Sequence, residues 1–208
     1  MPRRYTSTKR AIHLAETRQR IIDATFALHA ERGILGTKPA EIAARANVAL
    51  TTYYKHFPTP SDIVRACTAR GQELMPPPDP ATITVLPLDP ALRIHVMVRT
   101  LFGHYEKREP WLHAGRTEER YFPEIQLAMK LMGEWRDAFV QGALVPARAT
   151  REATAIATAL VDYWAWRTLR REIGLTQEEV IQTVTKTLKQ VVIAPVPDDG
   201  PRPARPGG

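Results

Sequence analysis

The sequence predicts an all-α protein, with an N-terminal three-helix helix-turn-helix domain and a C-terminal helical domain. Between its breaks the chain shows helical periodicity and no convincing run of strands. Two proline-rich stretches, residues 76–90 and 194–208, interrupt this pattern. We therefore expect helical domains over residues 15–75 and 91–193, joined by an extended linker and followed by a disordered tail.

Residues 1–14 form a basic segment ahead of the first predicted helix. They include Arg3, Arg4, Lys9 and Arg10. A flexible arm of this composition can enter a minor groove, as homeodomain arms do, or can simply keep a protein in solution. Both uses of this arm remain open.

Two longer helices are expected on either side of the most informative segment. The first covers about residues 15–32 and ends at Gly33, and the other covers about residues 60–74 and begins near Ser61. The apolar residues of the first fall near one face; they are Ile21, Ile22, Phe26 and Leu28.

Residues 38–57 indicate two short helices joined by a tight turn. Pro39 suits the first helical position because its φ is fixed at a helical value, and Glu41 lies near the positive end of that helix. Asn47 falls where the chain must reverse, a place that often needs positive φ. This pattern is typical of a DNA-reading helix-turn-helix.

The second short helix is expected over about residues 50–56. A helix of this length gains little from propensity and must be held by packing. Tyr53 and Phe57 are spaced i, i+4 on one face and are predicted to supply that packing. The polar residues between them are left pointing outward.

Positive charge is concentrated in the same part of the chain. Residues 1–75 hold 12 Lys/Arg and 6 Asp/Glu, a net +6, whereas residues 76–208 hold 17 and 16, a net +1. Such an excess commonly neutralises DNA phosphates, although a merely solvated basic face has the same composition.

Four helices are predicted beyond the linker. They cover about residues 89–109, 118–144, 148–173 and 176–193, with a short piece near Trp111. The last has the clearest start, because Thr176 and Glu179 form a capping box ahead of an apolar stripe.

Several segments near the N-terminus together resemble one protein family. They are Arg-Ile-Ile-Asp-Ala-Thr-Phe-Ala-Leu-His-Ala-Glu-Arg-Gly from Arg20, then Thr37, then Glu-Ile-Ala-Ala-Arg-Ala-Asn-Val from Glu41, then Thr-Tyr-Tyr-Lys-His-Phe from Thr52. Residues 20–63 thus resemble the DNA-binding domain of the tetracycline-repressor (TetR) family. The resemblance implies an all-α, homodimeric regulator of transcription, in most cases a repressor, whose C-terminal domain binds a small-molecule effector and so releases double-stranded DNA.

The resemblance also assigns candidate DNA contacts. It implies phosphate contacts for Thr37, Tyr54 and His56. It places four residues on the exposed part of the recognition helix, where base edges or a thymine methyl can be read. These four are Leu50, Thr51, Thr52 and Lys55.

The chain departs from the family pattern at six positions, which are His29, Lys38, Pro39, Asn47, Ala49 and Pro60. His29 stands where a core Phe is usual, so we expect different local packing, since a buried His needs a partner. Lys38 and Pro39 put the usual cap of the first short helix in doubt, and Thr37 could serve instead. Ala49 and Pro60 each remove an expected phosphate contact. Affinity should then depend more on the N-terminal arm and on Lys55.

Aromatic residues are abundant in the C-terminal half and could line an effector pocket. Tyr105, Trp111 and Trp135 are the candidate ligand-binding residues. Flat or cationic ligands would suit them, with Glu106, Glu109 or Asp162 as a possible counter-charge. Each of these aromatic residues could equally belong to the core, and the effector itself cannot be deduced.

The last two predicted helices, residues 148–173 and 176–193, match the family's usual dimer-forming pair in place and order. The stripe on the second could pack across a two-fold axis or against the core of its own chain. It consists of Val180, Val184, Leu188 and Val191.

Composition limits the other possibilities. A single Cys67, without a zinc-ligand pattern, is typical of a protein of the reducing cytoplasm. Neither a signal peptide nor a membrane-spanning stretch is present, so no membrane association is expected. The six histidines show no metal-binding spacing and no catalytic motif occurs, so the sequence predicts neither an enzyme nor a cofactor. A DNA-binding architectural protein without an effector is the remaining alternative.

Overall fold

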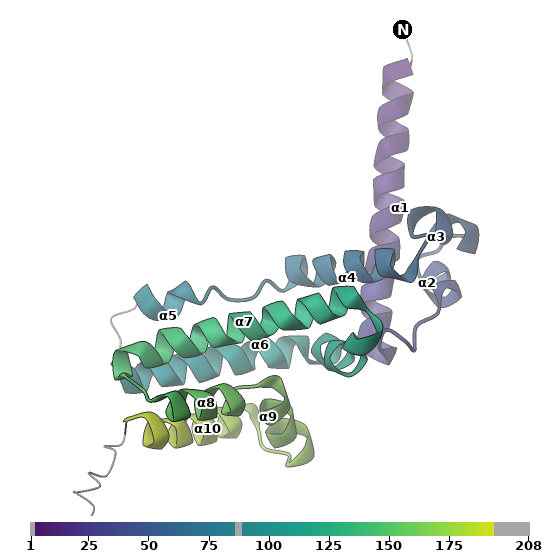
Figure 1. The fold of residues 1–208 in the computed structure, drawn as a ribbon. Helices are drawn as coiled ribbons and strands as arrows, with labels where there is room; N and C mark the ends of the chain where they lie inside the picture. The colour runs from purple at the N-terminus through teal and green to yellow at the C-terminus, as the bar shows by residue number, and fades with distance from the viewer. Residues whose placement is uncertain (1–2, 86–88, 194–208) are drawn as a thin grey trace, which may run out of the picture. The chain divides into compact units, whose positions relative to one another are not determined.

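A computed structural model describes residues 3–85 and 89–193, and every regular element in these ranges is a helix (Figure 1). The predicted all-α class is confirmed. The helices form two compact units. One contains the residues up to 80 together with residues 100–138, and the other contains residues 81–99 together with those from 139 onward. The division therefore does not follow the expected linker, because residues 100–138 group with the N-terminal helices. The expected tail, residues 194–208, lies outside the described residues.

The first unit contains the helix-turn-helix. Its elements are α1 (Arg3–Arg32), α2 (Pro39–Arg45), α3 (Leu50–His56), α4 (Pro60–Leu74), the 3-10 helix η1 (Glu119–Tyr121) and parts of α6 (Pro90–Glu118) and α7 (Pro123–Leu144). Helix α1 packs against both α2 and α4, and α2 packs against α3. The predicted start of α2 and the predicted bounds of α3 and α4 are confirmed.

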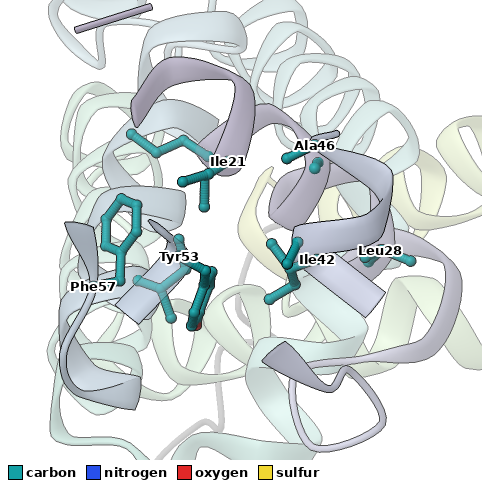
Figure 2. Close-up of a cluster of buried hydrophobic side chains, with 10 residues drawn as sticks. Ile21, Leu28, Ile42, Ala46, Tyr53 and Phe57 are labelled. Atoms are coloured by element: carbon teal, nitrogen blue, oxygen red, sulfur yellow. The ribbon is translucent and has the colours of Figure 1, made fainter. Parts of the chain in front are cut away.

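Side chains of α1, α2 and α3 converge in one apolar core (Figure 2). Ile21, Ile42 and Phe57 are each at most 2% exposed, and Tyr53 is 3% exposed. Three of the four residues predicted for the apolar face of the first helix, Ile21, Ile22 and Leu28, are buried here, whereas Phe26 is half-buried and lies outside this core. The two aromatic residues expected to hold the second short helix are buried here as well. Burial of this kind stabilises α2 and α3, which are too short to form in isolation.

The expected flexible arm is wrong for the described residues, since α1 begins at Arg3 rather than near residue 15. No Gly or Pro interrupts the segment between Arg3 and Arg32, and its Ala, Lys and Arg residues are good helix formers. From Lys9 onward the first buried side chain is that of Thr17, which is why the pattern alone suggested a later start.

Helix α6 is longer than predicted. It was expected to end at residue 109, but it continues through Pro110 to Glu118. A proline inside a helix removes one hydrogen bond and crowds the preceding turn. Leu112 and Ala114 are buried beyond it, so packing holds the helix in place. Helix α7 then starts at Pro123, five residues later than predicted, because η1 precedes it.

The second unit consists of short helices around its own core. It contains α5 (Ala81–Val85), η2 (Val145–Ala147), α8 (Arg151–Leu160), α9 (Tyr163–Arg167), the π-helix η3 (Thr168–Glu172) and α10 (Gln177–Ile193), together with the start of α6 and the end of α7. Helix α5 lies in the segment expected to be an extended linker, whose residues 86–88 fall outside the described ranges.

The prediction of a single helix over residues 148–173 is wrong, because α8 ends at Leu160 and a new helix, α9, begins at Tyr163. Asp162 has an extended conformation, and its carboxylate accepts a hydrogen bond from the amide of Trp164 at 2.9 Å. An Asp in this role starts a new helix, and the periodicity on both sides conceals the break. Helix α10 begins with the predicted box, in which the Thr176 hydroxyl donates to the Glu179 carboxylate at 2.8 Å.

Most of the apolar stripe on α10 packs within its own chain. Val180, Val184 and Leu188 are at most 2% exposed, and only Val191, at 37%, is open. The first three residues of the stripe therefore pack against the core of their own chain, which is one of the two alternatives given above. No helix in the described part of the chain is long and apolar enough to cross a bilayer.

Candidate nucleic-acid interface

A tight turn connects α2 to α3. The amide of Val48 donates to the carbonyl of Ala43 at 3.0 Å, and Asn47 adopts a φ of 54°. The left-handed conformation expected at this position is confirmed, and Asn tolerates it better than most residues. The turn thus fixes the direction of α3 relative to α2.

The start of α2 is capped in a different way from that expected. Thr37 does not cap it, because its hydroxyl donates to the carbonyl of Gly33 at 2.7 Å. Lys38 is the N-cap residue, and its amide donates to the Glu41 carboxylate at 3.0 Å. Pro39 occupies the first turn, as predicted. Thr37 is half-buried and lies directly before this helix end.

Helix α3 has one buried and one exposed face. Tyr53 is buried, whereas Tyr54 is 48% exposed and Leu50 is 41% exposed. Thr51 and Lys55 are also exposed. These two residues are four positions apart, as are Leu50 and Tyr54, so each pair lies on one side of the helix. The structure therefore brings these four predicted residues together on one open face. The remaining two, Thr52 and His56, are half-buried.

Two departures from the family pattern lie at the starts of α3 and α4. Ala49, the N-cap residue of α3, makes no side-chain hydrogen bond. Pro60 is the first residue of α4, where Thr59 accepts a hydrogen bond from the Asp62 amide and donates its hydroxyl to the Asp62 carboxylate. This capping box stabilises α4 without a basic side chain at its start.

Arg18 on α1 is a basic residue beside α3 that the sequence did not single out. Its guanidinium carbon lies 4.8 Å from the centre of the Phe57 ring, a cation–π arrangement. The side chain is exposed, so its charge is available to solvent beside the end of α3. Finding it required knowledge of how α1 packs on α3.

A cavity of about 140 Å³ lies in the same unit, between α1, α4, α6 and α7. Two of the predicted ligand-binding residues, Trp111 and Trp135, line it, and the third, Tyr105, is 1% exposed and does not. The indole nitrogen of Trp135 donates to the carbonyl of Pro78 at 2.7 Å. The three acidic residues proposed as counter-charges, Glu106, Glu109 and Asp162, are not among the lining residues.

A buried His–Cys pair forms part of the cavity wall. The Sγ atom of Cys67 on α4 lies 3.4 Å from Nδ1 of His29 on α1. Burial lowers the pKa of His29 to about 4 and raises the pKa of Cys67 to about 12, so both groups are neutral at pH 7. His29 thus has the partner that its position in the core requires. Among the described residues, no group of His, Cys, Asp and Glu could hold a metal ion.

Residues 21–67, which contain α2, α3 and most of their core partners, match the family model described as bacterial regulatory proteins of the tetR family. These residues form a TetR-family DNA-binding domain. This match covers the motif that builds the open face of α3. The expected family is therefore confirmed.

Curated relatives of this chain are repressors. It is 26% identical over 162 residues to the HTH-type transcriptional repressor KstR of Rhodococcus jostii, covering 74% of each chain. It is 28% identical over 164 residues to KstR of Mycolicibacterium smegmatis, covering 74% of this chain and 78% of the relative. The relatives are regulators rather than enzymes, and the chain is a DNA-binding regulator of transcription.

Solved structures share the fold. A transcriptional regulator from Rhodococcus superposes with a TM-score of 0.63 at 17% identity, over 84% of this chain and 95% of the other. A regulator from Saccharomonospora viridis in complex with choline gives a TM-score of 0.61 at 21% identity, over 84% of this chain and 96% of the other. The multidrug-binding protein EbrR, complexed with proflavin, gives a TM-score of 0.52 at 20% identity, over 82% of this chain and 98% of the other. The fold of these proteins therefore extends through most of the chain.

Proposed function

We propose that the protein is a ligand-responsive repressor of the cytoplasm that binds a pseudo-palindromic operator as a homodimer and is released by a small molecule. The observation that carries the DNA-binding part is the open face of α3, formed by Leu50, Thr51, Tyr54 and Lys55 above a buried aromatic pair. A short helix with one face locked into a core can present the other to a major groove.

Each side chain of this face has a chemistry suited to DNA. The Tyr54 hydroxyl and the Lys55 ammonium can donate to phosphate oxygens, and Lys55 can also reach a guanine edge. Leu50 and the methyl groups of Thr51 and Thr52 can contact a thymine methyl. Thr37 and His56 flank the face and are proposed as further phosphate contacts. These assignments require α3 to lie in the major groove.

A homodimer would present two such faces. The second unit leaves Ile156 on α8, Trp164 on α9 and Val191 on α10 between 37% and 44% exposed, and we propose that this apolar surface contributes to the dimer contact. A two-fold dimer requires half-sites a whole number of helical turns apart, with about 34–36 Å per turn.

The cavity supports the effector part of the proposal. It is lined by residues of α1 and α4, and α1 packs on α2 and carries part of the core beneath α3. A ligand that prefers one arrangement of these helices would shift the protein toward the arrangement that does not bind DNA. The structures with choline and proflavin show that proteins of this fold bind organic molecules.

Selection of bound duplexes from random DNA tests this function. We expect enrichment of a two-fold related sequence, and sedimentation of the complex should give two chains per site. Enrichment of a single half-site or of no sequence would contradict the proposal, and the second result would favour an architectural role. A screen of small molecules against the enriched duplex then tests release.

A further inference from the structure

A buried cationic side chain lies in the wall of the cavity described above. Arg108 on α6 lines it and is only 9% exposed. Its Nη1 donates to the carbonyl of Met75 at 3.1 Å, and its Nε is buried without a hydrogen-bond partner. Most of the donor capacity of this guanidinium is thus not used by the carbonyl of Met75.

The described wall of the cavity offers Arg108 no counter-ion. Its residues include no Asp or Glu, and the other titratable residues that line it, His29 and Cys67, are neutral at pH 7. Burial lowers the pKa of Arg108, as expected for a cation without a nearby counter-charge. A buried charge is ordinarily paired, and an unpaired one points to a missing anion.

Gly71 on α4 lies beside both Arg108 and Phe26. A Cβ atom at this position would lie 3.4 Å from Nη2 of Arg108, an ordinary contact distance, and 3.2 Å from the Phe26 ring, which is tighter. The glycine therefore lets the Phe26 ring pack closely on α4 next to the guanidinium. A planar guanidinium with free donors matches a carboxylate, which can accept two parallel hydrogen bonds from it.

The rest of the wall suits an apolar group. Phe26, Trp111 and Met129 line it, and the first two rings stack with centroids 4.4 Å apart. A dry cavity of about 150 Å³ is large enough for benzene, and this one is of similar size. The enclosed part of a ligand is therefore about one ring or a short branched chain.

We propose that this cavity binds an organic acid whose carboxylate pairs with Arg108 and whose ring-sized apolar part contacts Trp111 and Phe26. The inference deepens the proposed function, since it names the chemical class of the effector. The sequence suggested flat or cationic ligands, and the proposed acid has a negative charge instead of a positive one.

Paired ligands test the charge requirement. The full chain, without DNA, is titrated with benzoate, phenylacetate, 3-phenylpropionate and hexanoate, each against its carboxamide, and with 2-phenylethylamine as a cation. Binding is followed by tryptophan fluorescence and calorimetry. We expect at least one acid to bind about tenfold or more tightly than its amide, with no binding of the amine. An equal affinity for every acid and its amide, or binding of the amine alone, would overturn the inference.

Two substitutions locate the effect. Arg108→Met keeps an unbranched, flexible side chain, although a shorter one, and removes its charge, so it should abolish the preference for the acid. It should not lower the melting temperature, because an uncompensated buried charge is removed. Arg108→Lys should keep a weakened preference. A lower melting temperature for Arg108→Met with an unchanged preference for the acid would assign Arg108 a structural role instead.

Failure of this inference can be told apart from failure of the proposed function. An acid that binds at Arg108 without changing DNA affinity would contradict ligand release but leave the site assignment intact. A neutral or cationic compound that releases DNA while no acid binds would contradict the site assignment and leave the repressor mechanism intact.

Discussion

The indole nitrogen of Trp111 donates a hydrogen bond to the backbone carbonyl of Phe26 at 2.9 Å, and the two rings stack nearly parallel, 15° apart. The pair connects α6 to α1, and both side chains line the cavity. Helix α1 supplies Ile21 and Leu28 to the core beneath the helix-turn-helix. A ligand that displaces Trp111 would therefore act on the helix that supports α2 and α3.

Trp111→Phe should weaken this connection while keeping an aromatic ring. The Phe26 carbonyl loses its donor, and we expect the free energy of unfolding to fall by about 1–2 kcal/mol. Urea unfolding measures the change. Tyr121→Phe is the matched control, because Tyr121 is 50% exposed and should change stability by less than about 0.5 kcal/mol. Equal effects of the two substitutions would show that the Trp111 hydrogen bond contributes nothing.

The helix-turn-helix could be predicted because its determinants are local. Pro39, Asn47 and the spacing of Tyr53 and Phe57 specify two short helices and a turn within one segment of sequence. The family resemblance then added its expected functional context. Both kinds of information depend on residues close together in the chain.

The longer elements and the cavity depend on contacts that sequence patterns do not contain. Pro110 favours a helix end, yet tertiary packing carries α6 past it. No sequence pattern singles out Arg108, because the wall around it is assembled from four helices. The acidic groups considered near Trp111, such as Glu109, are close in sequence but do not line the cavity.

Glu118 at the end of α6 anchors the loop that precedes α2. Its carboxylate accepts hydrogen bonds from the amides of Ile34 and Leu35 at 2.9 and 2.8 Å. Glu118→Ala leaves both amides without this partner, and we expect a loss of about 1–3 kcal/mol in stability and weaker DNA binding. Thermal unfolding and a DNA titration check the two effects. Glu134→Ala, at a more exposed site on α7, should change neither, and an unchanged DNA affinity for Glu118→Ala would contradict a role in positioning α2.

Lys55→Ala and Tyr54→Ala should weaken DNA binding without unfolding the protein, because both side chains are exposed. If Lys55 contacts a phosphate, its removal should also reduce the slope of log K against log salt by about one. Titration of the selected duplex at several salt concentrations measures both quantities. Lys130→Ala on α7 is the control for general loss of charge. Unchanged binding of both α3 variants would remove these residues from the interface.

The stability of the protein should decrease as the pH falls below neutrality, in part because of His29. Its pKa is about 4 in the folded chain and near 6.5 in the unfolded chain, so the unfolded state takes up the proton first. The contribution of His29 is present above about pH 6.5 and is lost progressively toward pH 4, at up to about 1.4 kcal/mol per pH unit. His104 has the same lowered pKa and should act in the same direction.

His29→Phe isolates this contribution. The substitution replaces the buried imidazole with the residue usual in the family, so the free energy of unfolding should depend less steeply on pH between 6.5 and 4. Denaturant unfolding at a series of pH values measures the slope for each variant. His13→Gln is the control, because His13 is an exposed residue of α1 and should leave the slope unchanged. If His29→Phe and the unsubstituted chain lose stability in parallel as the pH falls, the proton that destabilises the fold is taken up by another group. The pair of His29 and Cys67 would then not control the acid sensitivity of the cavity wall.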